Sequence, residues 1–85
     1  MVVQGVDDQL ENLGMRIYPN PVSDFLNIEA AISDNHSYHI VGMSGRVYKS
    51  GKLELMIDVS TLTNGIYMMI LEDGQSTATF KFLKQ

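Results

Sequence analysis

Residues 65–83 read GIYMMILEDGQSTATFKFL, and this stretch decides the fold. Its first part is rich in apolar and aromatic residues that favour a strand. In its last part apolar and polar residues alternate, as they do when every second side chain of a strand faces a core. The apolar set there is Ala78, Phe80 and Phe82. Asp73-Gly74 between the two parts is a strong hairpin signal, so the stretch predicts two antiparallel strands joined by a turn.

The chain from Met15 onward shows the same organisation, with short β-type runs separated by proline, glycine and Ser-Asp-Asn clusters. The expected strands are 15–18, 25–30, 37–43, 46–50 (interrupted by Gly51), 52–59, 65–72 and 76–83, with a loop over 61–65. About seven short strands, and no long stretch of helical period, indicate an all-β antiparallel sandwich. A small barrel is the alternative, because it also buries one face of each strand.

The alternation also predicts which side chains form the core. In the fifth run Leu55, Ile57 and Val59 fall on one face, and Tyr38 and Ile40 are the expected inward pair of the third run. Of the adjacent Met68 and Met69, one is expected inside and one on the surface. The main core residues are expected to be Ile28, Ile40, Ile57, Val59, Leu62, Phe80 and Phe82.

Residues 1–14 differ from the rest, because Gly5, Gly14 and several acidic and amide residues dilute their apolar side chains. We expect a linker upstream of one domain over 15–85. No secretory signal peptide is visible at Met1, and we expect the chain to be a fragment of a longer protein.

Composition excludes several classes of function. The 85 residues carry a net charge of -4 and only 6 Lys or Arg, so neither nucleic acid nor an anionic membrane is an expected partner. No apolar run approaches the roughly 20 residues of a membrane-spanning helix. With 0 Cys, disulfides, thiolate metal sites and thiol catalysis are excluded.

Candidate catalytic and metal-binding residues are few. His36 and His39 flank the start of one expected strand and point to opposite faces, so neither a catalytic triad nor a metal pair is expected from them. Glu72-Asp73-Gly74 lacks the spaced oxygen ligands of a calcium loop and is expected to be a turn. Asp24 and Asp58 are expected to be solvated or to cap backbone amides. We expect no cofactor, no metal, no small-molecule substrate and no enzymatic activity.

The segment Tyr18-Pro19-Asn20-Pro21 is unusual, because two prolines flank an asparagine directly after a strand. Proline stiffens the backbone and removes hydrogen-bond donors. One interpretation is a rigid turn into the next strand. The other is a preformed recognition edge, because a stiff segment loses little entropy on binding.

Several motifs, in order, resemble the type A C-terminal sorting domain of the type IX (Por) secretion system. Tyr18-Pro19-Asn20-Pro21 followed by Leu26-Asn27-Ile28 is similar to the family's opening motif, and Gly45-Arg46 matches its Gly-Arg pair. A third motif is matched by Ile57-Asp58-Val59-Ser60, Leu62, Gly65 and Tyr67, and the short basic last strand by Lys81 and Lys84 with their neighbours. One position departs from the pattern: the family usually has Asp a few residues before the Gly-Arg pair, where this chain has Gly42.

The resemblance implies a seven-stranded Ig-like sandwich that works as an address label on a Gram-negative cargo protein. The cargo would cross the periplasm, be recognised at the outer-membrane translocon, lose the label to a sortase-like peptidase within 1–14, and reach the cell surface or the medium. Tyr18, Pro19, Asn20, Pro21, Gly45, Arg46, Asp58, Leu62, Gly65, Tyr67, Lys81 and Lys84 would carry recognition.

Other functions stay open at this point. One is an adhesion or carbohydrate-binding sandwich, although exposed aromatic residues are scarce. Another is a retained module that binds a periplasmic or cell-surface partner in signalling. A weak homodimer through an exposed edge strand, for which the last strand is the candidate, is a further hypothesis.

Overall fold

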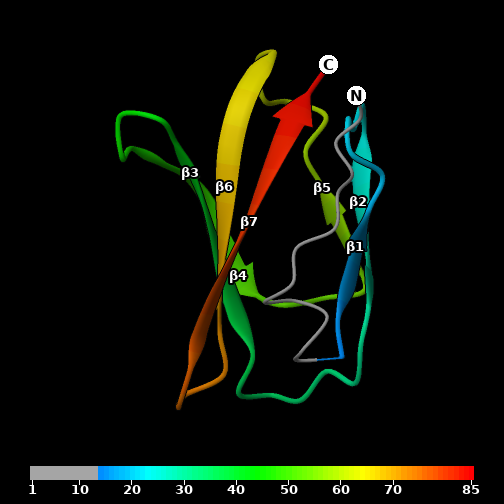
Figure 1. Cartoon of the computed structure of the whole chain (residues 1–85), viewed down its shortest axis with the longest axis vertical. Coiled ribbons are helices and arrows are strands. Elements are labelled where there is room, and N and C mark those ends of the chain that lie inside the picture. The colour runs from blue at the N-terminus through cyan, green and yellow to red at the C-terminus, as the bar shows by residue number, and fades with distance from the viewer. Residues whose placement is uncertain (1–13) are drawn as a thin grey trace.

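A computed structural model describes residues 14–85, which form seven strands in two antiparallel sheets that face each other (Figure 1). The all-β prediction is therefore confirmed, and the two separate sheets favour the sandwich over the barrel. Among these residues no helix is long and apolar enough to cross a membrane.

The smaller sheet has the strand order β1-β2-β5. Its strands are β1 (Arg16–Tyr18), β2 (Phe25–Glu29) and β5 (Met56–Asp58). The register pairs Ile17 with Ile28 and Leu26 with Ile57, and all four side chains are buried. Because alternate residues point the same way, the polar and charged residues between them face solvent.

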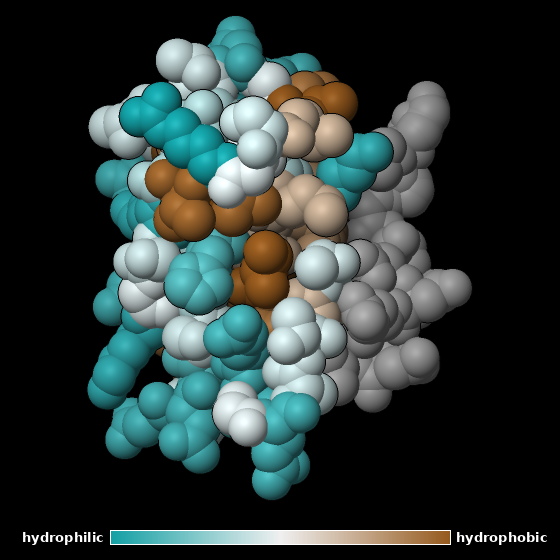
Figure 2. All heavy atoms as spheres, turned by 90° about the vertical axis from the view of Figure 1, so that its left-hand side faces the viewer, coloured by the Kyte–Doolittle hydropathy of each residue, from teal (hydrophilic) through white to brown (hydrophobic). Residues whose placement is uncertain are grey.

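The larger sheet has the strand order β4-β3-β6-β7. Its strands are β3 (Ser37–Gly42), β4 (Val47–Lys52), β6 (Gly65–Glu72) and β7 (Thr77–Lys84). The side chains that it buries against the smaller sheet include Tyr38, Ile40, Tyr67, Met69, Leu71, Ala78, Phe80 and Phe82. The outer face of this sheet is turned toward the viewer in Figure 2.

The expected core is largely confirmed. Ile28, Ile40, Ile57, Val59, Phe80 and Phe82 are buried, and Leu62 is half-buried against them. Met69 lies in the core and Met68 faces outward, as predicted for adjacent strand positions. Gly45 and Gly74 adopt left-handed φ angles of 92° and 93° in the β3–β4 and β6–β7 turns, a conformation that glycine takes without steric cost.

Two expectations for the middle of the chain are wrong. Gly51 does not interrupt β4, because β4 continues to Lys52. The strand expected over 52–59 is only β5, and Leu55 is 63% exposed, whereas Leu53 is buried. The reason is that this segment changes sheets: the Leu53 N–H donates to His36 O, directly before β3 of the larger sheet, and Leu55 O accepts the N–H of Ile28 in the smaller one. Where the chain crosses from one sheet to the other, apolar side chains no longer fall on every second residue.

A β-bulge also lies between β3 and β4. Ile40 pairs with Lys49 and Val41 pairs with Val47, so Tyr48 is the extra residue on β4, the bulged strand. The bulge brings the Tyr48 ring beside Gly42 and Tyr67 at one end of the sandwich.

Candidate functional site at one end of the sandwich

Within residues 14–85 no group of three or more His, Cys, Asp or Glu side chains could hold a metal ion. His36 is half-buried and its Nδ1 accepts the backbone N–H of Ser33 at 3.0 Å, with the Ser33 hydroxyl 3.1 Å away. Because the backbone N–H occupies the lone pair of Nδ1, this nitrogen is not placed to take a proton from the hydroxyl. His39 lies one residue from Tyr38 and points to the opposite, outer face of β3.

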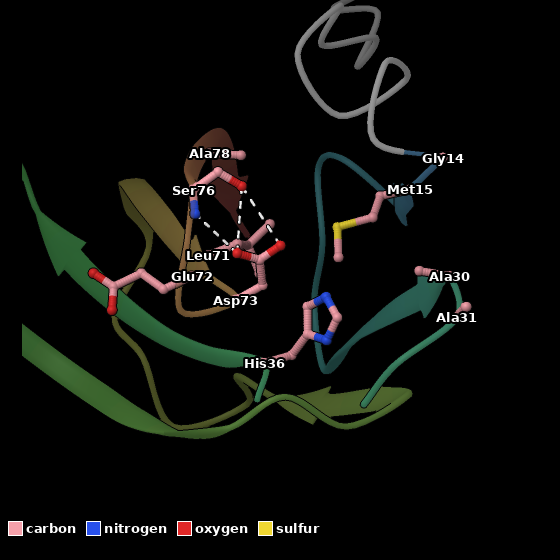
Figure 3. A pocket seen from close by; sticks show the side chains of 10 residues that line it. All are labelled: Gly14, Met15, Ala30, Ala31, His36, Leu71, Glu72, Asp73, Ser76 and Ala78. Carbon is pink, nitrogen blue, oxygen red and sulfur yellow. Dashed lines mark hydrogen bonds between the residues drawn. The ribbon is translucent and has the colours of Figure 1, made fainter. Parts of the chain in front are cut away.

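A hollow of about 270 Å³ opens between the sheets at the end where β1 begins and β6 ends (Figure 3). Met15, Leu71 and Ala78 contribute apolar walls, and His36 and Asp73 contribute polar ones. The backbone N–H groups of Gln75 and Ser76 donate to Asp73 Oδ1 and hold the pKa of the Asp73 carboxyl below its ordinary value. Asp73 therefore caps the β6–β7 turn, and the hairpin turn expected at Asp73-Gly74 is confirmed, although Glu72 is still the last residue of β6.

The motif residues lie at the opposite end. The connections 19–24, 43–46 and 59–64 and the last residues of β7 all gather there (Figure 1), and we call this end the motif pole. The register shows why: Gly42 pairs with Tyr67, and Gly65 pairs with Lys84. Antiparallel topology therefore brings together motifs that lie dozens of residues apart in the sequence.

Asn20 joins the first motif to the last strand. Its Nδ2 donates to Lys81 O at 3.1 Å, and its Oδ1 accepts the Leu83 N–H at 2.9 Å. The adjoining backbone continues the contact, because the Val22 N–H donates to Leu83 O at 2.9 Å and the Gln85 N–H to Val22 O at 2.8 Å. The segment thus behaves as a short extra strand on the edge of β7.

The neighbouring prolines suit this position. The peptide bonds before Pro19 and Pro21 are both cis, and both rings are exposed. Neither proline has an N–H, but the bonds to β7 use the side chain of Asn20 and the backbone of Val22, so no donor is missing at an edge. The segment is a structural clamp that leaves Tyr18, Pro19 and Pro21 on the surface.

A row of aromatic rings fixes the second and third motifs. Tyr67 is buried, and its hydroxyl donates to Thr63 O at 2.6 Å, which holds the 59–64 loop. The Tyr48 ring meets the Tyr67 ring edge-on with centroids 5.4 Å apart, and the Arg46 guanidinium carbon lies 5.1 Å from the Tyr48 centroid. A cation over an aromatic face is a favourable contact. Arg46 is thus held against the domain while it remains exposed.

Gly42 is explained by the same contact. A β-carbon on Gly42 would lie 2.8 Å from Cε2 of Tyr48, which is too close for a real contact. The Tyr48 ring therefore occupies the space that a side chain at position 42 would need. This gives the departure from the expected Asp a structural reason.

Asp58 stabilises the loop that follows β5. Its Oδ1 accepts the hydroxyl of Ser60 at 2.6 Å and the N–H of Ser60 at 2.8 Å, and these two bonds lower the pKa of the Asp58 carboxyl. Its backbone O accepts Lys49 Nζ at 3.0 Å, which bridges the two sheets. The next residue, Val59, donates its N–H to Asp24 O in the first connection of the pole. The capping role expected for Asp58 is confirmed.

The two expected basic residues differ. Lys81 is exposed on the outer face of β7. Lys84 is 6% exposed, and its Nζ donates to Gln85 O at 3.0 Å, so it is not a freely presented surface charge. Lys84 lies two residues after Phe82 and four after Phe80, so its side chain points to the same, inward face of β7. The alternation of the sequence predicts this orientation.

Sequence reasoning did not single out Tyr48, Val22 or Thr63, although each fixes a motif in place. Tyr48 acts through a bulge, and Val22 and Thr63 act through backbone contacts. These features have no local pattern in the sequence.

A sequence model of the family described as secretion system C-terminal sorting domain matches residues 16–85. No curated protein matches the chain.

Proposed function

The chain belongs to the family of secretion system C-terminal sorting domains, the signals for type IX secretion, and we propose that its motif pole is the surface that the export machinery recognises. A protein with this signal is exported to the cell surface or secreted, and the family is not known for catalysis. Family membership favours this reading over a retained binding module in signalling.

The convergence of the motifs supports the proposal. Motifs that are separate in the sequence meet at one end, and hydrogen bonds from Asn20 and Val22 join the first of them to β7. Exposed side chains at this end include Tyr18, Pro19, Pro21 and Arg46. Hydrogen bonds of Asn20, Asp58 and Tyr67 hold the shape of the pole, whereas the exposed residues are available to a partner.

The proposed partners are the outer-membrane translocon and a sortase-like peptidase of the type IX system. The cargo would pass through the periplasm with the sandwich folded. The proposed linker over 1–14, all but Gly14 of which lies outside the described residues, would carry the cleaved bond. Pairing of two copies along β7 would compete with the Asn20 and Val22 bonds that already occupy part of its edge.

A reporter export assay tests the pole. The full chain would be fused behind a reporter that has an ordinary signal peptide, in a bacterium with the type IX machinery. Arg46→Ala should reduce the reporter outside the cell several-fold while circular dichroism and the melting temperature stay near those of the unchanged chain. The physical reason is loss of an exposed cation that stacking on Tyr48 holds in place.

Arg16→Ala is the matched control, because Arg16 is exposed at the other end of β1 and its ion pair with Glu29, at 3.3 Å, lies on the surface. Its export should equal that of the unchanged chain. Equal export of the folded Arg46 and Arg16 variants would overturn the proposed role of the pole, and absence of export by the unchanged chain would overturn its activity as a signal in that host.

A further inference from the structure

The outer face of the larger sheet carries an apolar cluster that the core does not use. Sheets with one solvent face normally place polar residues there. In Figure 2 brown, apolar side chains gather over the upper and middle part of this face and are bordered by teal, hydrophilic ones. We call this cluster the apolar block, and its members are Val41, Val47, Ile66, Met68, Ile70 and Leu83.

Strand register makes the block contiguous. Val41 pairs with Val47 on one side and with Met68 on the other, which gives an apolar row across three strands. Ile66 pairs with Leu83 in the next row toward the motif pole. Neighbouring strands lie about 4.8 Å apart, so these residues are direct neighbours across the sheet. Val47 and Ile66 remain 54% and 43% exposed, so the block is open to solvent.

The charged side chains next to the apolar block are of one sign. Lys81 pairs with Met68 and closes the apolar row at β7. Arg46 lies in the β3–β4 hairpin next to Val47, whereas Lys84 is buried and Lys49 reaches Asp58 O of the smaller sheet, so these two lysines do not border the block. Within the described strands of the larger sheet the only carboxylate is that of Glu72, which lies two rows from Lys81 toward the other end of the sheet. The block is therefore bordered by Lys81 on β7 and by Arg46 in the hairpin, and none of the rows it occupies carries a carboxylate, on a chain whose net charge is -4.

A second copy of the chain does not fit this pattern. A two-fold arrangement that stacks one block on the other brings Lys81 near apolar side chains or near the other Lys81, without a carboxylate. An arrangement that places Lys81 of one copy beside Glu72 of the other also places the apolar row of the first copy over a polar row of the second. That polar row consists of Lys52, Ser37 and Glu72. Neither arrangement satisfies the apolar and the charged contacts together.

We propose that the apolar block is a docking surface for a protein partner that presents apolar side chains bordered by carboxylates. This inference rests on the function of the chain as a secretion signal, and the partner would act during export. Burial of open apolar side chains favours the complex, and Lys81 facing a carboxylate sets its orientation. The block adjoins the motif pole through Ile66 and Leu83, so one partner could cover both.

The test substitutes the centre of the block in the reporter fusion. Met68→Glu should reduce export about tenfold or more, because a carboxylate would face the partner's own carboxylates. Met68→Lys should reduce it less, because the added charge has the complementary sign. Lys81→Glu should resemble Met68→Glu. Each purified domain should melt near the temperature of the unchanged chain, since Met68 and Lys81 both face outward.

Met56→Glu is the matched control, because Met56 is 52% exposed on the outer face of the smaller sheet. It should export normally. Normal export of a folded Met68→Glu variant would overturn the docking surface while the secretion function stands, and equal defects from Met68→Lys and Met68→Glu would overturn the acidic character of the partner. Sedimentation of the purified chain that shows a dimer lost on Met68→Glu would overturn the proposal in favour of a second copy.

Discussion

Asn20 and Leu83 are 63 positions apart in the sequence, yet the side-chain oxygen of Asn20 accepts the Leu83 N–H at 2.9 Å. With the second bond to Lys81 O, the amide of Asn20 closes the edge of β7 as a backbone unit of a neighbouring strand would. The first family motif therefore has a physical task, which is to attach the β1–β2 connection to the last strand.

Asn20→Ala should destabilise the domain by about 1–3 kcal/mol, because two hydrogen bonds are lost and the Leu83 N–H loses its partner. Urea unfolding would measure the change, and amide exchange should accelerate at Leu83 more than at the centre of β6. Asn35→Ala, in an exposed turn, is the control and should change stability by less than about 0.5 kcal/mol. Unchanged protection at Leu83 in the Asn20 variant would contradict the clamp.

Gly42→Ala should displace the ring of Tyr48, because the new β-carbon overlaps Cε2 of that ring. Tyr48 is 44% exposed and its ring can rotate away, so the cost should be about 0.5–1.5 kcal/mol. Near-ultraviolet circular dichroism should report the loss of the edge-on contact between Tyr48 and Tyr67. In a double-mutant cycle, Tyr48→Ala should cancel most of the cost of Gly42→Ala. Additive effects of the two substitutions would show that the ring is not what excludes a side chain at position 42.

Phe80→Ala should block export by unfolding the label. Phe80 is 2% exposed, and truncation of a buried Phe costs about 3–5 kcal/mol, a large part of the roughly 5–10 kcal/mol that stabilises a small domain. Phe25→Ala is the control, because Phe25 is 42% exposed and its loss should leave the fold intact. Circular dichroism beside the export assay distinguishes the two. Normal export of an unfolded Phe80 variant would contradict a signal that is recognised in its folded form.

The sequence predicts those features of the structure that depend on residues close together in the chain. Alternation identifies Phe80 and Phe82 as core, because strand geometry assigns every second residue to one face. It fails at Leu55, because the chain there leaves one sheet for the other. Alternation could also have identified Lys84 as buried, had its charge not argued for exposure.

The candidate site is less predictable for the same reason. The motifs could be found in the sequence, but not which of their residues are structural. Asn20 acts on a strand 61 and 63 positions away, and Tyr48 depends on a bulge. Tertiary contacts of this kind leave no periodic pattern, so only the fold shows that Asn20 is a clamp and that Arg46 is exposed and held in place.

Acid should weaken the motif pole through Asp58. The hydroxyl and N–H of Ser60 favour the charged carboxylate, so the pKa of Asp58 is lower in the folded than in the unfolded chain. This contribution to stability is complete above the unfolded pKa of about 3.9 and is lost as the pH falls through the lower folded value. Asp73, whose pKa is also lowered, adds to the same loss.

Unfolding measured by urea between about pH 6 and pH 3 should therefore show stability falling from about pH 4 downward. Asp58→Asn should flatten part of this slope, because the amide oxygen still accepts the Ser60 N–H but does not titrate. Ser60→Ala retains the carboxylate and removes its hydroxyl donor, so a carbon-13 titration should move the pKa of Asp58 back toward its ordinary value. An unchanged titration in the Ser60 variant would show that the hydrogen bond is not the cause of the lowered pKa.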